Sequence, residues 1–334
     1  MAAVARGRTG LVAVGSSFPG PRAAAWVSPD GAAWRRTSLA GPDASLLTAV
    51  ATTADGYVAV GGAGPAAAAW TSRDGRTWTP SPVGGPPAGL SERMTAVIAW
   101  GRGAIAAGYA DGPSGRVPLA WMSPYGSDWV RTPLPGRGSV LGLAAGDGAI
   151  VAVGADDLNG AAARVALAWR SVDGAAWQTA AVTGADAAAL RGVLAIDRTA
   201  LPAGTGAGPA FVAVGSAAAG LRAAVWASVD GSSWIPHPGG SEMSNYGQRI
   251  AMAALAHDRA GFVAVGGRDS AGNGSPVVWT SDDAVSWSRA PDAPSFGGGE
   301  MTAVVAGAPG WIAVGSLGWP DNWVATAWVG VTRP

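Results

Sequence analysis

The chain has 334 residues with 22 basic and 22 acidic side chains, so its formal net charge is zero, and every basic residue is Arg. A neutral chain lacks the basic excess that binding to a phosphate backbone requires, so no nucleic-acid partner is expected. Its apolar stretches are short and broken by Gly or Pro, which argues against a membrane span of roughly twenty residues, and the absence of Cys excludes disulfides and thiol chemistry.

A four-residue sequence motif, called the repeated word below, recurs along the chain and sets the order of the predicted elements. Val-Ala-Val-Gly starts at Val12, Val58, Val151, Val212 and Val263, and near-copies start at Ile105 and Ile312. Self-similarity at a fixed period indicates a repeat architecture. We therefore divide the single predicted domain, 1–334, into seven repeats, which span about 1–46, 47–92, 93–139, 140–190, 191–248, 249–300 and 301–334.

Each repeat is predicted to contain four strands. A second apolar run precedes the word, as at Thr48–Ala51, Thr95–Ile98 and Thr302–Val305, and the Gly, Asp and Arg residues between them favour a tight hairpin turn. A third strand then ends in Trp at positions 26, 70, 121, 169, 226, 279 and 328. Six of these Trp residues are followed eight residues later by another, at positions 34, 78, 129, 177, 234 and 287.

Four-stranded units without long helical periodicity are typical of propeller blades, so we predict an all-β, seven-bladed β-propeller. The small residues of the first two strands suit the crowded axis, and the Trp residues suit the wider gaps between the outer parts of the blades. The last repeat has no second Trp, so its blade is predicted to lack the outer strand. Met1 aligns with Met94 and Met301 at the start of innermost strands. The alternatives are a three-stranded last blade or a native chain that begins further upstream.

The turn between the paired Trp residues also recurs. It reads Ser28-Pro-Asp30-Gly31-Ala-Ala-Trp34 in the first repeat, and Tyr125 and Ala284 replace one residue in two weaker copies. The Ser and Asp side chains can accept backbone N–H bonds, and Gly supplies a positive φ. The turn resembles the Asp-box of sialidases and related bacterial propellers, without the residue that usually separates Asp from Gly. In that family the box is a structural element away from the active site, so the resemblance implies the fold.

The loops after the second strands and between blades are expected on one face, around the channel mouth, where function is usually found. Arg93, Arg191 and Arg249 lie just before innermost strands and could clamp a carboxylate or sialic-acid-like ligand. Rim salt bridges are the alternative, because the only Glu residues lie on the same kind of connection, at Glu92, Glu242 and Glu300.

A sialidase would also need a nucleophilic Tyr paired with Glu and an acid–base carboxylate. Tyr246 near Glu242, with Asp156 or Asp157, is the only combination that the sequence offers. The two histidines, His237 and His257, are expected in loops and have no Ser or Cys companion for a triad. No catalytic residue is assigned.

A second candidate site is an aromatic and amide-rich rim. Trp319, Asp321, Asn322 and Trp323 follow the second strand of the last repeat, and such residues suit stacking on sugar rings or anchoring a protein partner. The alternative is that they cap the gap left by the missing strand. Further aromatic residues expected on loops of this face are Phe18, Tyr109 and Phe296.

Two polar loops carry the oxygen ligands that calcium prefers. They contain Asp156, Asp157 and Asn159, and Asp269 and Asn273. Neither matches a complete ligand spacing, so solvated loops are the simpler interpretation, and no metal or cofactor is predicted.

The leading functional hypothesis is a non-catalytic binding or scaffold propeller that recognises a glycan or a protein partner through its loop face. The resemblance implies an extracytoplasmic or secreted protein, and the richness in Ala, Gly and Arg suggests a bacterial coding bias. A sialidase-like glycoside hydrolase and a purely structural domain of a larger secreted protein are the alternatives. The sequence leaves the oligomeric state open.

Overall fold

The protein is an all-β structure whose sheets stand around a common axis. The computed structural model describes residues 1–17, 20–42, 44–156, 163–197, 208–237, 239–270, 273–307, 310–318 and 324–331. These residues form 27 β-strands and the short 3-10 helices η3 (Ala218–Gly220) and η4 (Ser241–Met243), and they contain no α-helix. No helix in the described part of the chain has the length and apolar character needed to cross a membrane.

Two sheets have eight strands each. The first has the order β1-β2-β3-β4-β8-β7-β6-β5. Its strands are β1 (Ala3–Gly7), β2 (Gly10–Ser17), β3 (Arg22–Ser28), β4 (Arg35–Leu39), β5 (Ser45–Thr53), β6 (Gly56–Ala63), β7 (Ala66–Ser72) and β8 (Thr77–Ser81). The second has the order β13-β14-β15-β16-β20-β19-β18-β17. Its strands are β13 (Ser139–Gly146), β14 (Ala149–Asp156), β15 (Val165–Ser171), β16 (Gln178–Val182), β17 (Ala189–Ala195), β18 (Phe211–Ala217), β19 (Arg222–Ser228) and β20 (Ser233–His237).

The other sheets are smaller antiparallel meanders. One four-stranded sheet contains β9 (Ser91–Trp100), β10 (Gly103–Gly112), β11 (Gly115–Ser123) and β12 (Val130–Pro133). The other contains β21 (Ile250–Asp258), β22 (Gly261–Ser270), β23 (Asn273–Ser281) and β24 (Ser288–Arg289). The last sheet has three strands within the described residues, β25 (Gly299–Ala306), β26 (Gly310–Leu317) and β27 (Val324–Val331).

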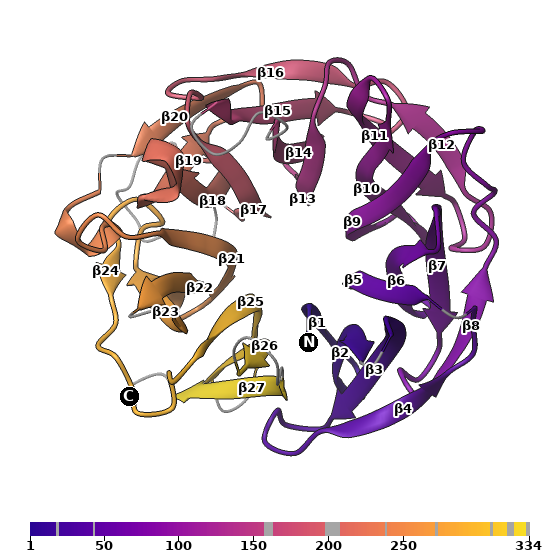
Figure 1. Ribbon diagram of the computed structural model, residues 1–334, viewed down its shortest axis with the longest axis horizontal. Coiled ribbons are helices and arrows are strands. Elements are labelled where there is room, and N and C mark those ends of the chain that lie inside the picture. Colours follow the sequence, from indigo (N-terminus) through magenta and orange to yellow (C-terminus); the bar gives the residue numbers. More distant parts are fainter. Residues whose placement is uncertain are drawn as a thin grey trace.

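Each eight-stranded sheet consists of two antiparallel meanders that join at their outer strands. The joints are parallel pairings of two residues each, between β4 and β8 and between β16 and β20. Figure 1 shows the meanders arranged radially, with β1, β5, β9, β13, β17, β21 and β25 nearest the axis. This arrangement is that of a β-propeller.

The hydrophobic core lies between neighbouring meanders. Val12 and Val14 of β2 are fully buried and share a cluster with Leu47, Tyr57 and Trp70 of the following meander. A strand covered on both faces needs an almost continuous apolar sequence. The repeated Val-Ala-Val word meets that need.

The third-strand Trp residues do more than fill space, because their indole N–H groups also fix the chain between meanders. Trp70 in β7 donates to the carbonyl oxygen of Ala40 at 2.8 Å, and Trp169 in β15 donates to that of Pro135 at 2.8 Å. Both acceptors lie on the segment that enters the meander. Trp226, Trp279 and Trp328 make the same kind of bond.

The recurring turn before the fourth strand is held by its own side chains. In the second repeat, the Gly75 N–H donates to Ser72 Oγ at 2.9 Å, and Asp74 Oδ1 accepts the next two backbone N–H groups at 2.8 and 2.9 Å. The Trp78 indole donates to the Gly75 carbonyl oxygen at 3.0 Å. Gly75 has φ of 72°, a conformation that favours glycine. The turns beginning at Ser28, Ser171 and Ser228 use the same Ser and Asp acceptors. In the turn beginning at Ser281, Asp283 accepts in the same way, but the Ser hydroxyl accepts from the Asp283 N–H at 3.3 Å.

The third repeat departs from this pattern. Tyr125 stands where the other turns have Asp, and its side chain is 73% exposed. The buried Ser123 hydroxyl has no hydrogen-bond partner in the structure. Trp129 donates to Ser81 Oγ at 3.1 Å instead of closing its own turn.

Most inner strands contain a β-bulge near their start, which leaves one residue unpaired with the second strand. The bulges omit Thr48, Thr95, Leu141, Arg191, Ala253 and Thr302 from the register. The Gly of the repeated word stands opposite. At Gly154, for example, a Cβ would collide with the carbonyl oxygen of Ser139. The repeated Gly therefore makes room for the bulge.

The first and last meanders meet at their inner edges. The Met1 amino group donates to the Gly315 carbonyl oxygen at 2.9 Å, and Thr302 Oγ1 lies 3.1 Å from the Met1 carbonyl oxygen. Thr48 and Thr95 make the equivalent contact with the meander that follows theirs, at 2.6 Å each.

Three side chains expected in loops lie in strands instead. Tyr109 is inside β10, where the Arg116 guanidinium lies 4.5 Å from its ring centroid. His257 is inside β21 and packs on Phe262, with ring centroids 4.3 Å apart, and His237 ends β20. The loop predictions were wrong because polar and aromatic residues extend these strands beyond their apolar parts.

Candidate functional site

A cavity with a volume of about 1020 Å³ opens on one face, around the axis. Its wall comes from the innermost strands, from the ends of second strands and from connections between meanders. The lining is distributed unevenly around the axis, because most of the lining residues belong to the part of the chain between Arg164 and Thr302.

In each inner strand that has a bulge, the bulge directs one side chain toward this cavity. All six bulge residues, Thr48, Thr95, Leu141, Arg191, Ala253 and Thr302, line it. Arg191 is the only charged residue among them. A bulge turns a side chain to a new direction without breaking the sheet, so the inner strands present a ring of residues to the axis.

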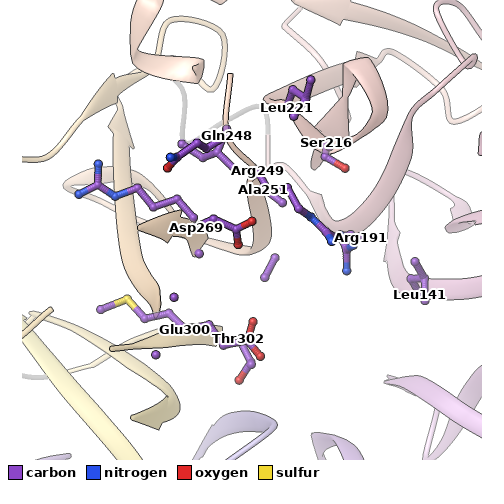
Figure 2. A pocket seen from close by; sticks show the side chains of 18 of the residues that line it. Leu141, Arg191, Ser216, Leu221, Gln248, Arg249, Ala251, Asp269, Glu300 and Thr302 are labelled. Carbon is purple, nitrogen blue, oxygen red and sulfur yellow. The ribbon is translucent and has the colours of Figure 1, made fainter. Parts of the chain in front are cut away.

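Charged side chains gather in the cavity although only 13% of the chain is charged. The basic residues are Arg164, Arg191, Arg249 and Arg268, and the acidic residues are Asp269 and Glu300. Figure 2 shows Arg191, Arg249, Asp269 and Glu300 around one space.

The charges of the cavity differ in how far they are already neutralised. Arg268 forms an ion pair with Asp292 at 2.6 Å, and Arg289 also reaches Asp292, at 3.4 Å. Within the described residues, Arg249, Asp269 and Glu300 are exposed and have no ion-pair partner. These three side chains are therefore available to a ligand.

The structure brings part of the predicted cationic site together. Arg191 and Arg249 line the cavity, as does Glu300. Arg93 is not among the lining residues, and its guanidinium lies over Gly62 in β6. Glu92 is buried and forms an ion pair with Arg131 of β12, which is not one of the three arginines of the predicted site.

The residues proposed for a sialidase-like reaction are not gathered in the cavity. Tyr246 is fully exposed at a turn with φ of 49°, and Glu242 accepts a hydrogen bond from the Gly240 N–H. Neither residue lines the cavity, although Gly247 and Gln248 do. Asp156 ends β14 and is not among the lining residues, and Asp157 lies outside the described residues.

The aromatic rim falls mostly outside the described residues, which include neither Phe18 nor Trp319, Asp321, Asn322 and Trp323. Phe296 is half-buried and packs against the core of the last meander. Of the two polar loops, Asn159 is outside the described residues, whereas Asp269 belongs to β22 and faces the cavity. The described residues contain no group of His, Asp and Glu side chains that could hold a metal ion.

Sequence reasoning missed the ring of bulge residues and the part that Asp269 plays in the cavity. The available signal was the Gly that ends every copy of the repeated word, because a Gly inside a strand often marks a bulge opposite it.

Comparison with known proteins supports the fold and leaves the function open. No family model matches the chain, and no curated protein matches it. The crystal structure of Saccharomyces cerevisiae Sqt1, a propeller, is similar with a TM-score of 0.51 and 10% identity, over 94% of this chain and 79% of that chain. The α-L-arabinofuranosidase Arb93A from Fusarium graminearum, in complex with an iminosugar inhibitor, has a TM-score of 0.48 and 14% identity, over 84% and 92% of the two chains. At these identities the likeness concerns the fold alone.

Proposed function

We propose that this protein is a non-catalytic binding propeller whose ligand, a glycan or a segment of a protein partner, enters the cavity around the axis. In this proposal each antiparallel meander is one blade, so the ring has seven blades, and the two outer-strand joints link neighbouring blades. The turns that begin at Ser28, Ser72, Ser171, Ser228 and Ser281 are Asp-box-like elements that hold the blades.

One observation carries the binding proposal. In a chain with few charged residues, one open cavity is lined by the carboxylates of Asp269 and Glu300 and by three arginines besides Arg268, which pairs with Asp292. These arginines are Arg164, Arg191 and Arg249. Arg191, Asp269 and Glu300 lie on strands, so the sheets fix the backbone from which each of these side chains extends. A largely pre-formed concave site with a few converging polar groups is typical of ligand recognition.

The hydrolase alternative has less support. It needs a nucleophile and an acid–base group on either side of a bound sugar. Tyr246 and Glu242, the pair that the sequence offers, do not line the cavity.

A glycan array and a fluorogenic sialoside assay test the proposal together. We expect saturable binding of at least one immobilised glycan without turnover, and a loss of at least about tenfold in affinity in Arg249→Ala. Arg102→Ala is the matched control, because Arg102 is an exposed arginine at the hairpin between β9 and β10. If the wild type hydrolyses the sialoside and Tyr246→Phe does not, the hydrolase would replace the binding propeller as the favoured function. A pull-down with the wild type and Arg249→Ala covers a protein partner, and no specific binding in any assay would leave the purely structural role.

A further inference from the structure

The bulge positions allow the repeats to be compared at the axis residue by residue. Thr occupies the bulge in β5, β9 and β25. Each hydroxyl lies between two carbonyl oxygens, one of its own sheet and one of the next. For Thr95 these are Ala107 at 3.1 Å and Val140 at 2.6 Å. These hydroxyl groups therefore serve to tie neighbouring inner strands together.

The bulge in β17 differs from this pattern. Arg191 replaces the small or aliphatic residue found at the other bulges, and it lines the cavity with its long cationic side chain. The ring can be built without a charge here, because Leu141 and Ala253 occupy the equivalent positions in β13 and β21. The charge at Arg191 thus serves something other than the closure of the ring.

The opposite charge comes from other strands. Asp269 lies near the end of β22, and its N–H donates to the Arg249 carbonyl oxygen at 2.9 Å. Glu300 lies in β25 beside Gly267, where an added Cβ would stand 3.2 Å from Glu300 Cβ. Figure 2 shows Arg191 on one side of the space and Asp269 and Glu300 on the other.

Opposite charges on separate walls select against ligands of a single sign. A ligand with only an anionic group is attracted by Arg191 but repelled by the two carboxylates. A purely cationic ligand is attracted by the two carboxylates but repelled by Arg191. Both effects are stronger near a protein surface than in bulk water, because the effective dielectric constant is lower there. A ligand with both charges gains at both walls.

We infer that the cavity binds a zwitterionic small molecule, with its anionic group on Arg191 and its cationic group on Asp269 and Glu300. This inference rests on the proposal that the cavity is a binding site and goes beyond it, because a zwitterionic small molecule is a further ligand beside the glycan or protein segment proposed above. Arg191 and the two carboxylates determine specificity.

The test is calorimetric titration of the full chain with ω-amino acids of increasing length, from β-alanine to ε-aminocaproate. Each is compared with the acid and the amine of the same chain length, such as δ-aminovalerate with valerate and pentylamine. We expect one member to bind at least about tenfold more tightly than either single-charge analogue. An acid or amine that binds as tightly as its amino acid would overturn the inference.

Substitutions test which residues bind the anionic end of the ligand and which bind the cationic end. Arg191→Thr installs the residue that other bulges carry. It should reduce affinity for the amino acid at least about tenfold, and it should raise the affinity for the amine, because the repulsion between two cations is removed. Arg102→Thr makes the same change at an exposed arginine that does not line the cavity, and it should leave all affinities unchanged. The double variant Glu300→Gln with Asp269→Asn should reduce affinity for the amino acid and spare the acid. If Arg191→Thr does not fold, Arg191→Gln replaces it.

Unchanged affinity in the Arg191 variant would contradict the assignment. Binding to the glycan array without binding of any ω-amino acid would overturn the zwitterion inference and leave the binding function in place. An absence of binding in both experiments, and in the pull-down, would overturn both.

Discussion

The Thr95 hydroxyl joins two neighbouring sheets, with Oγ1 2.6 Å from the carbonyl oxygen of Val140 and 3.1 Å from that of Ala107. This contact predicts the effect of an isosteric change. Thr95→Val should lower the free energy of unfolding by about 1 kcal/mol, because it removes the hydroxyl and leaves the Val140 carbonyl without this donor. Urea denaturation measures the change. Thr79→Val, on the exposed strand β8, is the control, and an equal effect in both variants would contradict the role of the contact.

The Gly of the repeated word gives a second prediction. Gly154→Ala should lower the free energy of unfolding by at least about 2 kcal/mol, because its Cβ would overlap the Ser139 carbonyl oxygen. Gly85→Ala is the matched control, since nothing lies within 4 Å of a Cβ there and its φ is not positive, and it should stay within about 0.5 kcal/mol of the wild type. Thermal and urea denaturation of the two variants compare them directly, and similar stability would disprove the steric requirement.

The incomplete turn of the third repeat can be repaired. Tyr125→Asp should stabilise the protein by about 1 kcal/mol, because it supplies a partner for the buried Ser123 hydroxyl and an acceptor for the following N–H groups. The exposed Tyr125 ring contributes little packing. Tyr125→Ala removes the ring without adding the carboxylate and should not stabilise. Equal unfolding midpoints for Tyr125→Asp and Tyr125→Ala would show that the carboxylate has no part.

The turns also predict a loss of stability in acid. Backbone N–H bonds from Thr77 and Arg76 hold the pKa of Asp74 below its ordinary value of 3.8, and those from Ala176 and Ala175 do the same for the pKa of Asp173. A carboxyl with a lower pKa in the folded chain binds fewer protons there than in the unfolded chain. Its stabilisation is therefore complete above the unfolded pKa and is lost as the pH falls through the folded pKa.

The measurement is the urea midpoint at several values between neutral pH and about pH 3, where Asp near its reference pKa is largely protonated. Asp74→Asn should be less stable than the wild type at neutral pH, and the difference should shrink toward acid. Asp55→Asn, at an exposed hairpin turn, serves as the control. A constant difference between wild type and Asp74→Asn across this range would rule out the titration.

The sequence predicts the propeller from features that act locally. Hairpin turns, apolar runs and paired Trp residues repeat with nearly constant spacing, and short-range turn chemistry determines them. It does not predict which inner-strand residue faces the axis, because a bulge shifts the alternation by one position. Arg93 and Arg191 therefore look alike in the sequence, yet Arg191 is the bulge residue, whereas Arg93 lies two positions before its bulge and covers Gly62.

The acidic wall was also beyond sequence reasoning. Asp269 belongs to a polar segment that suggests a loop, and only the pairing of Ser270 with Asn273 extends β22 and β23 through it. Glu300 resembles Glu92 in being the second residue of an inner strand, but Glu92 pairs with Arg131 and is buried. Whether such a carboxylate is paired depends on whether an outer strand places an Arg beside it, as β12 places Arg131 beside Glu92. That contact forms only when the strands assemble, so the local sequence does not reveal it.

The parallel joints between β4 and β8 and between β16 and β20 make the perimeter of the ring unequal. Where they occur, backbone groups on the outer side of a meander have partners. The strands β12, β24 and β27 end their sheets instead, and a sheet edge offers unpaired N–H and C=O groups to any extended chain. Slow amide exchange is therefore expected at the joined residues, and an extended chain that adds a strand to the perimeter is expected to pair with β12, β24 or β27.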